Sequence, residues 1–439
     1  MPKLLKGSKK LLFAWAFYDW ANSVYSLVIA SAIFPIYYQA LFKAANVETV
    51  MIFGGNIRST PLISYTTAAA FLLVAIISPL LSGIADYVGN KKNFMKFFCY
   101  LGASSSMALY FFSLDRIELS LACYFFGLVG FWGSLVFYNS YLPDVAFTEQ
   151  QDKISARGYS LGYIGSVVLL LFNLLMVMKP GVFGFGEDNQ ASLTAMRWSF
   201  VTVGIWWILF SQYSFYYLPK GNKNDKKVTT KILLNGFREL KGVYNSLSEN
   251  LQLKRFLNAF FVYSMAVQTV MLVATYFGEQ EIDWGGSDEK TIGLISSILI
   301  IQLVAVFGAE MTSRASRKFG NISVLIFINI IWVTICVVAF FITSPIQFYI
   351  TAAVVGMVMG GIQSLSRSTY SKFLPQTKDT TSYFSFYDVA EKIGIVIGML
   401  LYGFIDQITG SMRNSILFLV LFFLTGVFLL LRVPIKKNN

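Results

Sequence analysis

Charged side chains interrupt stretches of this sequence that are otherwise apolar. Asp19 follows an apolar run that begins near Leu11, and Asp388, Glu391 and Lys392 interrupt another run near the end of the chain. If Leu11 marks the edge of a membrane, Asp19 lies ~12 Å inside it at the rise of an α-helix. A carboxylate there costs at least ~2.5 kcal/mol, so it must face other helices or a water-filled cavity. Such residues bind protons or polar solutes, or anchor one helix to another.

Asp19 belongs to a polar stripe along one face of its predicted helix, with the spacing i, i+4, i+7 and i+11. The stripe consists of Trp15, Asp19, Asn22 and Ser26. We take Asp19, Asn22 and Tyr25 as candidates for contact with substrate or a coupling proton. The alternative is a structural carboxylate that is held by a neighbouring helix, for which Arg157 is the candidate partner and itself a candidate site residue.

The second charged group contains two acids and one amine. Asp388 and Lys392 stand four residues apart with the acid first, which is the favourable order for an ion pair within a helix. Glu391 is then a second acid beside the same amine. One interpretation is a network that holds one conformation until a proton or a substrate neutralises a member. The other is a self-satisfied pair that lets the helix be buried.

Polar residues also gather at the ends of two predicted spans. Tyr138 and Asn139 end the fourth span, and Gln363 and Arg367 occupy the matching end of the tenth. Phenol, amide and guanidinium groups can line a polar cavity. The neighbouring Gly360 favours close helix packing, so packing or gating is the preferred interpretation of this region.

The sequence gives no support for an enzyme. It has no histidine, so any proton transfer must use carboxylates, and its three cysteines lie within spans without metal-like spacing. We find no phosphate-binding loop of an ATP-driven pump. A membrane-embedded enzyme would have only Asp388 and Glu391 as a catalytic pair, and this alternative is disfavoured. We therefore expect no catalytic residue, no cofactor and no metal.

The elements that must position these residues are membrane-spanning helices. The chain of 439 residues is 56% apolar and only 13% charged, and apolar runs of membrane-crossing length fill most of it. We predict an all-α integral membrane protein with twelve spans. They lie near 11–41, 63–84, 94–114, 117–141, 155–178, 196–218, 255–277, 291–311, 321–343, 345–369, 383–405 and 411–432.

The distribution of positive charge predicts the orientation. There are 35 Lys and Arg residues against 23 Asp and Glu residues, and most basic residues fall at the termini and in alternate loops. That asymmetry places both termini in the cytoplasm and explains the positive charge without nucleic acid.

The sequence contains two related halves. Gly83-Ile84-Ala85-Asp86 is echoed by Gly308-Ala309-Glu310, and Leu142-Pro143 by Leu374-Pro375, at an offset of roughly 230 residues. We predict six-helix bundles over 1–218 and 255–439, with the substrate site between them. The linker 219–254 contains an amphipathic pattern, which predicts a helix on the cytoplasmic side. Its apolar positions are Leu233, Phe237, Leu240, Tyr244, Leu247 and Leu251.

The loop after the second span is a candidate gating loop. Its proposed functional residues are Gly83, Asp86, Gly89 and Lys92. The glycines permit a tight turn, and Asp86 can cap a helix or bridge to a basic partner. We expect Lys91 and Lys92 to lie at the lipid headgroups.

Several motifs resemble a known family. The loop 83–92 is similar to the signature loop of the major facilitator superfamily, with Asn90 where that superfamily usually has Arg. Other segments resemble the vacuole-effluxer-like branch, also called the unknown major facilitator family, which includes fungal autophagy-related amino-acid exporters. These segments are WAFYDWANSVY (15–25), SARGYSLGY (155–163), GIQSLSRS (361–368) and FSFY (384–387). The departures are Ser166, Ser385 and Glu391, where the resemblance implies glycine, glycine and a small residue.

The resemblance implies two pseudo-symmetric six-helix bundles in the bacterial inner membrane, and amino-acid efflux as the activity. We expect a secondary active transporter of a small solute that works by alternating access, with proton coupling through Asp19. The expected partners are a small-molecule substrate, protons and the lipid bilayer, without nucleic acid or an obligate protein partner. A sensor that keeps the fold without transporting, and a carrier of another metabolite class, remain alternatives.

Overall fold

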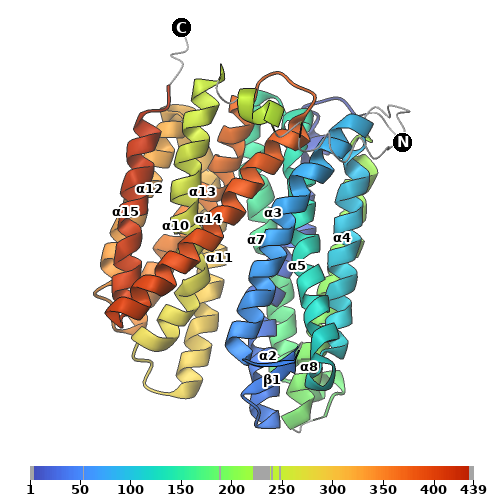
Figure 1. Ribbon diagram of the computed structural model, residues 1–439, viewed down its shortest axis with the longest axis vertical. Helices are drawn as coiled ribbons and strands as arrows, with labels where there is room; N and C mark the ends of the chain where they lie inside the picture. Colours follow the sequence, from blue (N-terminus) through green and yellow to red (C-terminus); the bar gives the residue numbers. More distant parts are fainter. Residues whose placement is uncertain are drawn as a thin grey trace. The chain divides into compact units, whose positions relative to one another are not determined.

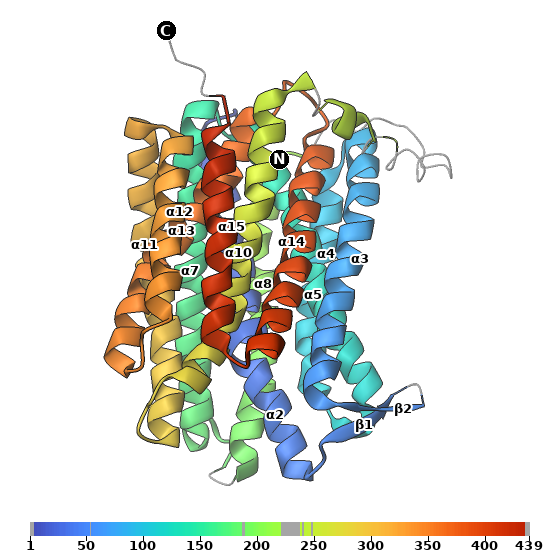
Figure 2. The same ribbon diagram turned by 60° about the vertical axis from the view of Figure 1, so that its left-hand side comes forward.

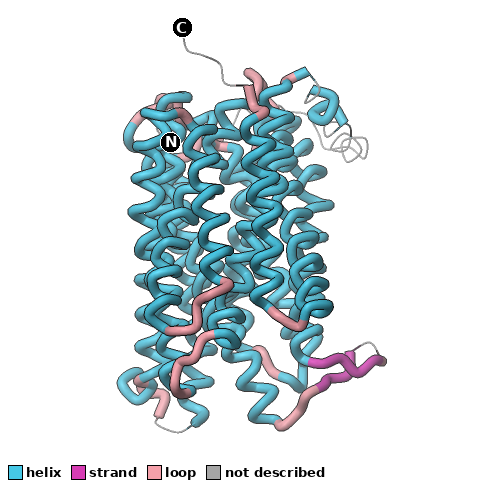
Figure 3. Tube along the Cα trace, turned by 90° about the vertical axis from the view of Figure 1, so that its left-hand side faces the viewer, coloured by secondary structure: helices cyan, strands magenta, loops and turns pink. Residues whose placement is uncertain are grey.

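The structure is almost entirely helical (Figure 3). The computed structural model describes residues 4–52, 54–186, 189–220, 238, 241–246 and 249–434. Every one of the twelve predicted spans coincides with helix, and ten helices in these described ranges are long and apolar enough to cross a membrane. The predicted all-α integral membrane fold is therefore confirmed.

The chain forms two compact units, and the helices of unit 1 come from its first half. Unit 1 comprises Met1–Tyr138 and Leu161–Val228. Its long helices are α1 (Lys9–Val24), α2 (Phe34–Ala45), α3 (Ser59–Val88), α4 (Lys91–Ala108), most of α5 (Ile117–Ser140), the later part of α7 (Thr148–Met178) and α8 (Asn189–Tyr217). Short 3-10 turns cover Leu109–Phe111, Leu114–Arg116 and Pro180–Phe183.

Unit 2 comprises Asn139–Ser160 and Thr229–Asn439. It therefore contains the short α6 (Leu142–Val145) and the beginning of α7, which the repeat in the sequence assigns to the first half. Its long described helices are α10 (Leu251–Glu281), α11 (Ser287–Phe319), α12 (Asn321–Ala339), α13 (Pro345–Phe373), α14 (Thr380–Thr409) and α15 (Met412–Leu431), labelled in Figure 1.

In unit 1, α8 packs against both α1 and α4. The predicted first span is one continuous helical rod, in which a π-helical stretch, Tyr25–Ile33, joins α1 to α2. The Ser31 hydroxyl donates to the Ser26 carbonyl over 2.9 Å within this stretch. Pro35, the second residue of α2, has no N–H to donate backwards, which favours a local change of helix geometry.

A small hairpin in unit 1 was not predicted. Strand β1 (Thr49–Ile52) pairs antiparallel with β2 (Gly55–Arg58) between α2 and α3, as Figure 2 shows. The strands lie between the first two predicted spans.

In unit 2, α11 lies along α13, α15 packs against α10 and α12, and α14 packs against α10. Gly360 on α13 faces the backbone of Ala305 on α11, and a β-carbon at Gly360 would overlap the Ala305 carbonyl oxygen. The predicted close packing at Gly360 is confirmed.

The turn between α3 and α4 contains fewer residues than the motif 83–92 from which the candidate gating loop was predicted. Gly83 and Asp86 lie inside α3, and the turn itself is made by Gly89, whose φ of +67° is in the left-handed region that favours glycine. We expected Lys92 to lie at the lipid headgroups, and this prediction was wrong. Lys92 is buried, and its ammonium donates to the Leu218 carbonyl over 2.7 Å at the end of α8.

The predicted linker helix lies mostly outside the described residues. Leu233, Phe237, Leu240 and Leu247 are not among them. The described members Tyr244 and Leu251 are 67% and 48% exposed.

Candidate functional site

Asp19 in unit 1 is held by a side chain of α5. It is only 4% exposed, and the Tyr138 hydroxyl donates to its Oδ2 over 2.7 Å. The Trp15 ring stacks on the Tyr138 ring at 4.7 Å, and its Nε1 donates to the Tyr138 carbonyl over 3.0 Å. Arg157, the partner suggested from the sequence, is exposed on α7 in the segment that belongs to unit 2. Tyr138 is thus a partner of the acid in its own unit.

Asn22 and Tyr25 place polar groups close to Asp19 along the same rod. Both are buried, and the Ser23 hydroxyl donates to Asn22 Oδ1 over 3.3 Å. The Asn22 amide nitrogen and the Tyr25 hydroxyl have no hydrogen-bond partner among the described residues. Because buried polar groups ordinarily have partners, these two positions suit contact with water or a polar solute.

The three charged residues of α14 form the ion pairs expected from their spacing. Lys392 Nζ lies 2.9 Å from Asp388 Oδ1 and 2.9 Å from Glu391 Oε2. The Lys392 and Asp388 side chains are almost fully buried, whereas the Glu391 side chain is 18% exposed. The predicted i, i+4 pair is confirmed, and the amine is shared with the second acid.

Glu391 also joins α14 to α10, because Gln268 Nε2 donates to Glu391 Oε1 over 2.9 Å. Both residues line a cavity of about 20 Å³ within unit 2. Its walls come from α7, α10, α13 and α14, and are Tyr159, Phe260, Tyr263, Ser264, Val267, Gln268, Ile362, Gln363, Ser366, Tyr387 and Glu391. We call this set the Glu391 cavity. Gln363, which was expected to serve packing or gating, contributes to its wall.

Arg367 lies one helical turn beyond Gln363 and is 2% exposed. It donates to the hydroxyl and carbonyl oxygens of Ser155 at 2.9 and 3.0 Å, and to Asn139 Oδ1 at 3.2 Å. Its guanidinium stacks 4.2 Å from the centre of the Tyr159 ring. The structure therefore brings the candidates Asn139 and Arg367 together, and Tyr159 connects them to the Glu391 cavity.

Unit 2 contains a second polar cluster, which was not predicted from the sequence. Asp152, near the start of α7, accepts hydrogen bonds from Lys372, from Asn321 over 3.0 Å and from Ser316 over 3.1 Å. These three donors come from α13, α12 and α11. No local pattern predicts this cluster, since all three donors lie more than 150 residues from Asp152 in the sequence.

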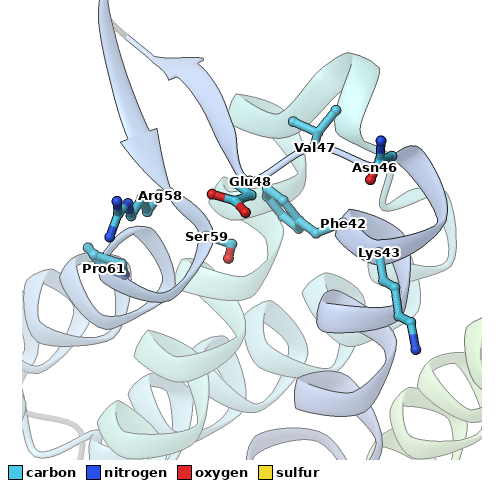
Figure 4. A pocket seen from close by; sticks show the side chains of 8 residues that line it. All are labelled: Phe42, Lys43, Asn46, Val47, Glu48, Arg58, Ser59 and Pro61. Carbon is cyan, nitrogen blue, oxygen red and sulfur yellow. The ribbon is translucent and has the colours of Figure 1, made fainter.

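Another cavity lies away from these acids. It has a volume of about 520 Å³ and lies in unit 1 around the end of α2 and the β-hairpin. Glu48 and Arg58 are among its lining residues, and Figure 4 shows the Lys43 ammonium pointing away from both. These three side chains are exposed, and Lys43 lies on the same helical rod as Asp19, ~36 Å further along at the rise of a helix. This surface depression is a weaker candidate than the buried groups.

The sequence matches known proteins over nearly its whole length. Residues 7–439 match the family described as Vacuole effluxer Atg22 like. The uncharacterized MFS-type transporter YxiO of Bacillus subtilis (strain 168) is 30% identical, covering 99% of this chain and 97% of that protein. Autophagy-related protein 22 of Kluyveromyces lactis is 24% identical, covering 98% of this chain and 93% of that protein.

Solved structures of transporters resemble this one. The fucose:proton symporter FucP of E. coli matches with a TM-score of 0.67 at 16% identity, covering 97% of this chain and 98% of that one. The proton:xylose symporter XylE matches with a TM-score of 0.71 at 12% identity, covering 98% and 96%. At these identities the similarity concerns the fold alone.

Proposed function

Because the chain belongs to the vacuole effluxer Atg22-like family and has the fold of the major facilitator superfamily, we propose that it is a secondary active transporter of small organic solutes. Family and fold are those of a multi-pass membrane transporter and not of an enzyme. The proposal that it transports small organic solutes rests on the buried polar and charged side chains within the helices. Such groups are costly in a membrane and mark solute or ion pathways.

Amino acids are the first substrate class to test. The resemblance to fungal amino-acid exporters supports this choice, and so does the Glu391 cavity, whose amide, hydroxyl, phenol and carboxylate groups suit one polar group of a small solute. The bacterial relative and the basic termini support a location in the bacterial inner membrane with both termini in the cytoplasm.

Alternating access is the mechanism that best fits a chain with two related halves. In this mechanism the halves rock so that a site is open to one side of the membrane at a time. The bodies that we propose to move are the two related halves of the chain, residues 1–218 and 255–439.

Asp19 is our candidate for coupling transport to protons. The chain has no histidine, so a buried carboxylate is the group best suited to take up and release a proton during the cycle. The Tyr138 hydroxyl, 2.7 Å from Asp19 Oδ2, stabilises the ionised form by donating to it. Uptake of a proton by Asp19 would weaken that bond and so alter the contact between α1 and α5.

The test is transport by purified protein in proteoliposomes that contain labelled amino acids, with and without a pH gradient. We expect saturable movement that follows the gradient. Asp19→Asn keeps the shape of the side chain but removes its proton-binding site, so gradient-driven transport should fall at least ~10-fold while downhill exchange of solute persists. Asp115→Asn, an exposed acid of the same unit, is the matched control and should transport like the parent.

Two outcomes would contradict these proposals separately. If Asp19→Asn keeps both gradient-driven transport and its pH profile, Asp19 is not the coupling group. If the protein binds a solute but moves none across sealed vesicles, in which a carrier of known activity succeeds, it is a sensor and not a transporter.

A further inference from the structure

Glu391 is the charged residue of its cavity. Of the described residues that line the cavity, it alone carries a formal charge, and the others are aromatic, aliphatic, hydroxyl or amide side chains. Its ion-pair partner is Lys392, which also pairs with Asp388. Two acids therefore share one base, and among the described residues neither acid has another basic partner within 4 Å. With all three ionised, the group carries one negative charge in excess.

The excess charge is accessible from the cavity. The Asp388 side chain is almost fully buried and does not line the cavity, whereas the Glu391 side chain is partly exposed and lines the cavity wall. Glu391 Oε1 accepts from Gln268 and Oε2 accepts from Lys392. A carboxylate has about four acceptor positions, so capacity for a further donor remains.

The rest of the wall also suits a cation. The Phe260 and Tyr387 rings stack at 4.1 Å, and Tyr263 packs edge-on against Phe260 at 5.7 Å. Aromatic faces attract ammonium groups through their quadrupoles. A cavity of about 20 Å³ holds one water-sized group, and an ammonium group is of this size.

We propose that Glu391 selects the net charge of the solute, and that the transported solute carries a net positive charge, with one of its ammonium groups paired with the Glu391 carboxylate in this cavity. The inference rests on the proposed transport function and adds a substrate class to it. A neutral group leaves the excess negative charge unbalanced, and a carboxylate adds to it. The site therefore favours amines and cationic amino acids over neutral and acidic ones.

The experiment uses four probes with the full-length protein. L-Lysine, L-norleucine and 2-aminoadipate share an amino-acid backbone and differ in a cationic, neutral or anionic end, whereas cadaverine is a diamine without a carboxylate. Uptake into proteoliposomes gives KM for each, and the rise in unfolding temperature in detergent gives binding. We expect lysine and cadaverine to bind and move best, and 2-aminoadipate least.

Glu391→Gln keeps the size of the side chain and an oxygen that accepts from Gln268, but removes the charge. We expect KM for lysine to rise at least ~30-fold while KM for norleucine changes little, because loss of a buried charge partner acts on the cationic solute. Glu279→Gln, an exposed acid at the end of α10, is the matched control and should keep the parent preference.

The experiment distinguishes failure of this inference from failure of the transport proposal. If norleucine or 2-aminoadipate is moved and lysine and cadaverine are not, transport stands and Glu391 does not select cations. The inference is also wrong if Glu391→Gln keeps the parent preference, or if no probe binds at millimolar concentration. If the Glu391→Gln protein fails to fold, the order in which the parent protein prefers the four probes still tests the inference.

Discussion

At the scale of single residues, Lys392 is the side chain on which the buried charges of α14 depend. It donates to Asp388 and Glu391 at 2.9 Å each and is itself buried. Lys392→Gln leaves two carboxylates without their amine, and breaking a buried pair in this way costs about 3–5 kcal/mol. We expect a large fall in the unfolding temperature of the detergent-solubilised protein.

The control for this prediction is Lys254→Gln, which removes an exposed amine of the same unit and should change stability by less than ~0.5 kcal/mol. Equal unfolding temperatures for the two variants would mean that Lys392 does not compensate the buried acids. Recovery of stability when Asp388→Asn is added to Lys392→Gln would support the charge argument further.

Residue contacts could be predicted from the sequence where they are local. The four-residue spacing of Asp388 and Lys392 is fixed by helix geometry, so their pair was predictable. The bond from Gln268 to Glu391 depends on the packing of α10 against α14 and has no local signal. Lys92 was placed wrongly because its charge predicts headgroup contact, whereas it satisfies a carbonyl at the end of α8, where helix carbonyls lack internal partners.

At the scale of elements, glycine sets the distance between α11 and α13. Gly360→Ala adds a β-carbon that overlaps the Ala305 carbonyl oxygen, so one helix must shift. We expect a loss of about 1–3 kcal/mol, measured by thermal unfolding. Gly403→Ala is the control, because its β-carbon meets nothing within 4 Å and alanine is the better helix former. A loss as large in the control would contradict the packing explanation.

The sequence predicts the elements that depend on the length of an apolar run. It does not predict features that depend on local backbone geometry. All twelve spans coincide with helices because runs of this length have one stable form in a membrane. The π-helical stretch Tyr25–Ile33 was not predictable, since hydropathy does not distinguish π from α geometry. The β-hairpin Thr49–Arg58 was missed for a related reason, because its strands have only four residues each and leave little pattern in the sequence.

At the scale of the whole molecule, the compact units do not follow the repeat in the sequence at every point. The repeat assigns residues 139–160 to the first half, yet they pack in unit 2. The Ser155 contacts with Arg367 and the Asp152 cluster account for this, and both depend on partners more than 150 residues away.

The Asp152–Lys372 ion pair fastens this segment to the rest of unit 2, and a charge exchange tests it. Both side chains are mostly buried, so Asp152→Lys or Lys372→Asp alone places like charges together and should cost ~3 kcal/mol or more. The double exchange restores opposite charges and should recover at least ~1 kcal/mol beyond the sum of the two single effects, as measured by thermal unfolding. Because the segment continues into α5 and α7, we expect transport to fall in each single variant and to recover in part in the double. Strictly additive losses in both measurements would mean that the pair does not hold the segment, and that Ser155 and Arg367 alone determine its place.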